Sequence, residues 1–149
     1  MKKIAVVSLF LAGLLLGGCG RTMVLGDEVK IEVNQLEGLS MEVVGEPTNR
    51  SATVRVTNET NTDYLSDILF AVHAERNGKW YGLVNQFEGD HIAELNGYPA
   101  NSLSGEIRCL WNSEYGALDK GHYRIVYYLF ESTGGVGERY PVAAEFFIQ

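Results

Sequence analysis

Positive charge is scarce in this sequence. Lys and Arg together number 12 against 19 Asp and Glu, which gives a formal net charge of −7 at pH 7. Nucleic-acid binding begins with a basic surface that neutralises phosphates, so no nucleic-acid partner is expected for a chain of this kind. An excess of acidic residues favours solubility instead.

Motifs for catalysis and metal binding are also missing. The sequence has no HExxH or CxxC pair for zinc, no GxSxG turn for a serine nucleophile and no calcium loop with ligands at alternating positions. The histidines are His73, His91 and His122, and Asp90, His91 and Glu94 would share a face if that stretch were helical. This spacing alone does not make a metal site. We therefore predict no catalysis, no cofactor and no bound metal.

The long apolar run of the chain lies at its N-terminus. Thirteen apolar or small residues from Ile4 to Leu16 follow two lysines. A membrane span needs about 20 apolar residues and the centre of a secretory signal about 7 to 15, so the run predicts a signal peptide. It ends in L-G-G-C, which resembles the lipobox of bacterial lipoproteins, and this resemblance implies a lipid on Cys19. The alternative is an ordinary signal peptide with an incidental cysteine.

Cleavage before Cys19 would divide the chain into three parts. Residues 1–18 would be the signal peptide, residues 19–35 a tether and residues 36–149 a single domain. Within the tether, the alternation at Val29–Val33 is typical of a half-buried strand or an extended lead-in. Loss of the two N-terminal lysines would take the formal charge from −7 to −9.

The chain has too few cysteines for a disulfide bond within the domain. The chain has two cysteines, and a lipid on Cys19 would leave Cys109 without a disulfide partner. Cys109 alternates with Ile107 and Trp111, which predicts a small buried side chain rather than a reactive thiol. The hydrophobic core must then hold the domain together unaided.

Short stretches of alternating apolar and polar residues predict an all-β domain. Turn residues recur about every 8 to 12 residues and no long amphipathic pattern is present, which favours an antiparallel β-sandwich of about seven strands. Asn77-Gly78, between two β-prone runs, predicts a tight hairpin. Residues 84–101 receive no strand, and a short helix at Asp90–Leu95 is considered there. The expected strands are 39–43, 52–57, 68–76, 79–83, 104–111, 122–131 and 140–148.

The stretch 111–130 has the layout of a corner between two sheets. Leu118 is expected to be a buried plug, and the turn Asp119-Lys120-Gly121 leads into a β-prone run. In immunoglobulin-like sandwiches a tyrosine at the start of such a strand turns its ring inward, and its hydroxyl bonds the backbone a few residues upstream. We expect Tyr123 to do the same.

Four motifs occur in order: N-G-K-W-Y at 77–81, a strand ending in Trp111, Y-G-A-L at 115–118 and G-H-Y-R-I-V at 121–126. Together they resemble the bacterial immunoglobulin-like domain found in small surface lipoproteins. The resemblance implies a tethered immunoglobulin-like sandwich without catalytic residues. A segment longer than usual, Phe87–Pro99, departs from the family pattern. The residues that the resemblance marks as structural are Trp80, Trp111, Tyr115, Gly116, Leu118, Gly121 and Tyr123.

Aromatic residues make up 11% of the chain, more than one core can take. Exposed Tyr and Trp side chains are common anchors for proteins and sugars, so we consider an interaction face near Trp80, with Tyr81 and Phe87 as its residues. The alternative is that these rings pack between the sheets and along their edges.

The sequence thus predicts an extracytoplasmic module, attached by lipid to the cell membrane or the outer membrane. Its expected role is structural, or the binding of a protein or glycan. A small envelope hydrolase, or an inhibitor of an envelope enzyme, is the alternative.

Overall fold

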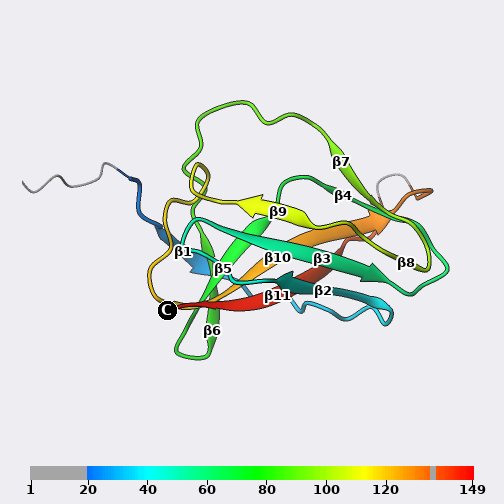
Figure 1. The fold of residues 1–149 in the computed structure, drawn as a ribbon, viewed down its shortest axis with the longest axis horizontal. Coiled ribbons are helices and arrows are strands. Elements are labelled where there is room, and N and C mark those ends of the chain that lie inside the picture. The colour runs from blue at the N-terminus through cyan, green and yellow to red at the C-terminus, as the bar shows by residue number, and fades with distance from the viewer. Residues whose placement is uncertain (1–19, 135–136) are drawn as a thin grey trace, which may run out of the picture.

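The computed structural model describes residues 20–134 and 137–149, and this part of the chain contains strands and no helix. The predicted signal peptide and Cys19 lie outside the described residues. Within them, no helix is long and apolar enough to cross a membrane. The strands, drawn in Figure 1, are β1 (Leu25–Glu28), β2 (Leu39–Val44), β3 (Ser51–Asn58), β4 (Tyr64–Asp67), β5 (Ala71–Arg76), β6 (Lys79–Leu83), β7 (Leu95–Tyr98), β8 (Ser102–Leu103), β9 (Ile107–Leu110), β10 (Gly121–Glu131) and β11 (Tyr140–Ile148).

Two antiparallel sheets make the fold. The larger sheet has the order β1-β6-β5-β10-β4-β7, with β11 also paired to β10, and the smaller has the order β2-β3-β8, with β9 also paired to β3. The long strand β10 is central, because β5 and β4 follow one another along one of its edges while β11 occupies the other. The predicted all-β antiparallel sandwich is therefore confirmed.

The core lies between the sheets and follows from alternation along the strands. In β3, Ala52, Val54 and Val56 are buried while the residues between them are half-exposed. They face Ile125 and Leu129 of β10, which belong to the same buried cluster. Each such side chain contributes about 1.5 to 3 kcal/mol when fully buried, so the core provides most of the stability.

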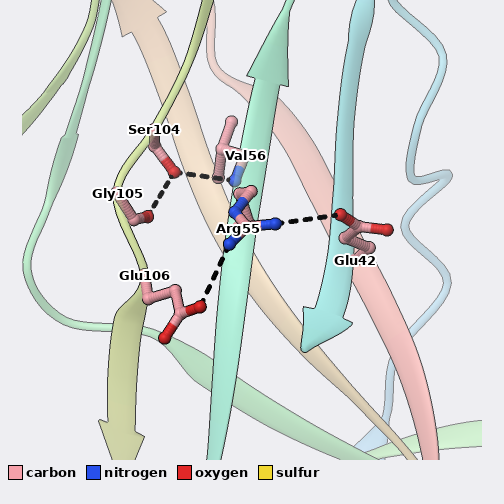
Figure 2. Close-up of polar contacts among 6 residues, drawn as sticks. All are labelled: Glu42, Arg55, Val56, Ser104, Gly105 and Glu106. Carbon is pink, nitrogen blue, oxygen red and sulfur yellow. Dashed lines mark hydrogen bonds and ion pairs between the residues drawn. The ribbon is translucent and has the colours of Figure 1, made fainter. Parts of the chain in front are cut away.

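The outward face of the smaller sheet is held by polar contacts (Figure 2). Arg55 on β3 contacts Glu106 at 3.0 Å and Glu42 of β2 at 3.9 Å. The Ser104 hydroxyl accepts a hydrogen bond from Val56 N at 2.9 Å and donates one to Gly105 O at 2.8 Å. These contacts lie where three residues, 104–106, face two residues of β3. The resulting bulge separates β8 from β9, and Ser104 replaces a missing backbone partner there.

The hairpin predicted at Asn77-Gly78 is present. Both residues have positive φ, 54° and 79°, and β5 and β6 pair directly around them from Arg76 and Lys79. Asparagine and glycine accept this left-handed backbone more readily than other residues, which is why the pair marks the turn in the sequence.

Two expected elements differ in the structure, and the strands β4 and β7 were not expected. The proposed helix at Asp90–Leu95 is absent, and β7 begins at Leu95 instead. The strand expected at 68–76 begins at Ala71, and a separate strand, β4, precedes it. β4 and β7 both carry polar residues, which obscure the apolar alternation in the sequence. Ser66 of β4 can be buried because its hydroxyl is hydrogen bonded to the Tyr98 hydroxyl of β7 at 3.0 Å.

The segment expected to be a tether is also partly folded. Leu25–Glu28 forms β1, which pairs with β6 at the edge of the larger sheet, whereas Val29–Val33 is not a strand. Before β1, the backbone of Arg21 and Met23 is hydrogen bonded to Ala117 at 2.9 and 3.2 Å. The mostly exposed residues of this segment give little apolar signal, so the sequence alone suggested a tether.

The corner between the sheets has the geometry expected of it. The Tyr123 hydroxyl donates to Asp119 O at 2.8 Å, and Leu118 is buried against the core. Gly116 has a φ of 79°, and a Cβ at this position would lie 2.7 Å from Arg21 O, so a side chain there would be both strained and obstructed. The other aromatic residues of the corner are anchored in the same way, by bonds from Trp111 Nε1 to Asn49 O and from the Tyr115 hydroxyl to Phe70 O, each 2.9 Å long.

Replacement of Tyr123 by Phe should lower the free energy of unfolding by about 1 kcal/mol or more, because Asp119 O loses its hydroxyl donor in the interior. Tyr140→Phe is the matched control, since its hydroxyl bonds an exposed carboxylate, that of Glu138. Urea unfolding measures both variants. Equal midpoints for Tyr123→Phe and the wild type would contradict a stabilising role for this corner.

Cys109 should react slowly with a maleimide in the folded protein and rapidly in denaturant. Its side chain is fully buried, and burial raises its pKa to about 11, so almost no thiolate is present at neutral pH. The experiment uses a Cys19→Ser background, in which Cys109 is the one thiol of the chain. Rapid labelling without denaturant would show that this face of β9 opens readily.

Candidate functional site

The segment between β1 and β2 crosses the larger sheet, and we call its residues 29–34 the strap. At one end, Val29 N donates to Trp80 O of β6 at 2.8 Å. At the other end, the Asn34 side chain bonds the backbone of Ala143 in both directions, at 2.8 and 3.1 Å. Because β5 and β10 lie between β6 and β11, the strap spans all four strands.

The strap covers the face of this sheet that is turned away from the core, here called the outer face. Val29 lies against Gly82, whose register places it beside His73 on that face. Along the strap, Val29, Ile31 and Val33 are half-buried and the intervening residues are exposed. The predicted alternation is therefore real, but the strap packs its apolar side chains on a sheet face instead of joining a ladder.

Two charged or titratable residues are buried on the outer face. His73 of β5 and Arg124 of β10 are opposite one another in register and only 3% and 4% exposed. Arg124 Nε donates to His73 Nδ1 at 3.0 Å, and the guanidinium lies 4.4 Å from the centre of the Trp80 ring. The second guanidinium nitrogen, Nη2, is buried and has no hydrogen-bond partner. Sequence patterns do not reveal this pair, since both residues alternate with core residues as surface residues would.

The hydrogen bond fixes the protonation state of His73. Arginine can only donate, so His73 Nδ1 must accept and the ring is neutral with its proton on Nε2. Burial, and secondarily the charge of Arg124, lower the pKa of His73 to about 4. The site thus holds one positive charge, that of Arg124, and no carboxylate of the described residues lies within ion-pair distance of it.

A row of rings continues the outer face beside the strap. His122 lies 5.0 Å from Trp80 and is stacked on Phe147 at 4.3 Å between ring centres. Its Nε2 contacts a Glu145 carboxylate oxygen at 2.8 Å. Phe147, at the outer edge of the row, is 63% exposed. No pattern in the sequence singles out Phe147.

The interaction face expected around Trp80 is divided by the structure. Trp80 points to the outer face, whereas Tyr81, its neighbour in β6, is paired with Ala74 of the inner face. Phe87 is 39% exposed in the irregular segment after β6 and lies 4.8 Å from His91. The three aromatic residues therefore do not form one surface.

A hollow lies between the irregular segment 84–94 and the edge of β9. It has a volume of about 470 Å³, and its apolar rim includes Leu69, Ile92 and Leu110. His91, Asp90 and Glu114 are also in its lining. In residues 20–134 and 137–149, no group of three or more His, Cys, Asp or Glu is placed to hold a metal ion.

The buried neutral His73 should make stability depend on pH. Its pKa is about 4 when folded and about 6.5 when unfolded, so the unfolded chain binds a proton that the folded chain does not. Stability is therefore lost as pH falls from about 6.5 to about 4, by about 3 kcal/mol. His73→Gln keeps an acceptor for Arg124 without titrating. Urea unfolding at pH 7 and pH 4.5 should show a smaller pH effect in this variant, and identical effects would mean that His73 does not titrate in this way.

Comparison with known proteins adds the family of the domain. Residues 35–147 match the model of a family described as a bacterial Ig-like domain, a range that covers all strands from β2 to most of β11. No curated protein and no solved structure matches the chain significantly. The matched range begins after the strap, so β1 and the strap lie outside it. On the strength of this match and of the sandwich described above, the chain belongs to the bacterial Ig-like domain family.

Proposed function

We propose that this chain is a lipid-anchored, extracytoplasmic Ig-like module without catalytic activity, which presents a binding face to a protein or glycan in the cell envelope. Family membership supports a structural or interaction role. The apolar run from Ile4 to Leu16 and the L-G-G-C sequence that ends at Cys19 support the lipid anchor.

The observation that carries the proposal is that the folded domain begins only two residues after Cys19, at Arg21. Arg21 O accepts from Ala117 N at 2.9 Å, and the Arg21 side chain donates to Gln86 O. Each extended residue spans about 3.5 Å, so a lipid on Cys19 would lie within about 7 Å of this contact. The sandwich would then stand directly on the membrane, with the end that carries Ala117 and Gln86 nearest to the lipid.

The energetics of acyl chains fit this arrangement. One buried methylene contributes about 0.8 kcal/mol, so a single acyl chain holds a protein marginally and two or more hold it stably. Electrostatic attraction would not help, because a domain with this negative net charge is repelled by anionic lipid. Membrane attachment should therefore depend on the lipid of Cys19.

Replacement of Cys19 by Ser should abolish incorporation of labelled fatty acid and release a folded protein from the membrane fraction. Cys109→Ser is the matched control, which should stay membrane-bound and labelled because Cys109 is buried in the sandwich. Fractionation with a salt wash and mass spectrometry of the N-terminal peptide measure the outcome. A Cys19→Ser protein that remains with the membrane, or an unmodified Cys19 in the mature wild type, would refute the anchor.

A further inference from the structure

The strap covers part of the domain from outside the residues that match the family model. It precedes the matched residues 35–147, yet it lies over side chains that belong to them, Arg124 and His73. These two side chains are on the face turned away from the core, where packing between the sheets cannot bury them. The strap, together with the Trp80 ring that lies 4.4 Å from the guanidinium, therefore removes them from solvent.

The strap covers this face but leaves one buried donor of Arg124 without an acceptor. Burial lowers the pKa of Arg124, which reflects the loss of water around its guanidinium, and the charge of Glu145 opposes this shift only in part. Nη2 has no hydrogen-bond partner, and the nearest cross-strand carboxylate, that of Glu145, is bonded to His122 instead. The acidic residue of the strap, Glu32, is on its exposed side. A buried donor left without an acceptor is costly, so the face under the strap lacks one hydrogen-bond acceptor.

We propose that this outer face, with Arg124, His73 and Trp80, is a binding site for an extended peptide that carries a carboxylate, and that the strap is a built-in cover which such a peptide displaces. This inference rests on the proposed role as an interaction module and names the class of its partner.

The present occupant indicates why the ligand should be a peptide. The strap lies across the sheet in an extended form, with Val29, Ile31 and Val33 inward at every second position. The Asn34 side chain then bonds the backbone of Ala143 and ends the crossing at the sheet edge. A peptide with the same alternation could pack its apolar side chains on the same face. The site therefore already accommodates this kind of chain.

The orphaned guanidinium nitrogen indicates why the ligand should carry a carboxylate. The planar guanidinium matches a carboxylate through parallel N–H···O bonds, and Trp80 holds it from one side at 4.4 Å. A charge-assisted hydrogen bond in a buried site changes affinity by about tenfold to a hundredfold. A peptide that supplies this bond would have a higher intrinsic affinity for the face than the strap has. The strap competes because it belongs to the same chain and is therefore always close to the face.

Fluorescence anisotropy on the full chain in detergent tests the proposal. The strap is opened by Val29→Ser/Ile31→Ser/Val33→Ser, and the matched control is Lys30→Ser/Glu32→Ser, which changes only its exposed side. The probes are labelled peptides of sequence V-K-I-Q-V with a C-terminal amide, in which a single Asp is moved through the five positions, each paired with the Asn version. An oligomer of a uronic acid serves as the acidic sugar.

The strap-opened variant should prefer Asp to Asn by about tenfold or more at one position at least. The wild type and the control should bind the same peptide more weakly, because the strap competes. Arg124→Lys in the strap-opened background should reduce the preference, since lysine lacks the guanidinium fork.

Three results would overturn the proposal: no Asp preference at any position, equal binding by the wild type and the strap-opened variant, or binding of the uronic acid without binding of the peptides. Circular dichroism checks folding, and if the triple variant does not fold, Ile31→Ser alone carries the same comparison. Binding is measured in detergent, so its failure is distinct from a failure of the Cys19 anchor.

Discussion

A stack of three buried rings joins the two sheets. Trp111, at the end of β9, lies 5.4 Å from Phe146 of β11, which in turn lies 5.7 Å from Tyr123 of β10. Hydrogen bonds to Asn49 O and Asp119 O fix the outer members of the stack. Cys109 is a free thiol, so cohesion between the sheets depends on this packing and its polar anchors rather than on a covalent link.

Buried polar groups in the core are paired, which makes the outer face stand out. Asn58, only 1% exposed, donates to Tyr98 O and Thr62 O at 2.9 Å and accepts from Thr60. Such satisfied groups fix loops without a net penalty. Arg124 is different, because its charge is buried with a neutral histidine and an unfilled donor. The proposed peptide site is centred on this buried donor.

The predictions that failed share a physical cause. β4 and β7 escaped notice because a short strand with Ser66 or with Asn96-Gly97 gives no apolar period. Pairing makes them strands: β4 pairs with both β10 and β7. Apolar and polar residues do alternate at Val29–Val33, and its apolar residues are half-buried as this alternation predicts. The alternation could not show what the segment packs against. A strand paired at the edge of a sheet and an extended segment lying on the face of a sheet have the same alternation.

By itself the sequence determined the elements whose causes are local. Positive φ at Asn77-Gly78 requires residues of those types, alternation in β3 follows from the pleat, and the corner before Tyr123 rests on contacts within a few residues. Only the tertiary structure decided that Trp80 faces away from Tyr81 toward His122, and that the strap covers Arg124. These contacts join segments far apart in the chain, and their geometry depends on strand order and register, which side-chain patterns along one segment do not encode.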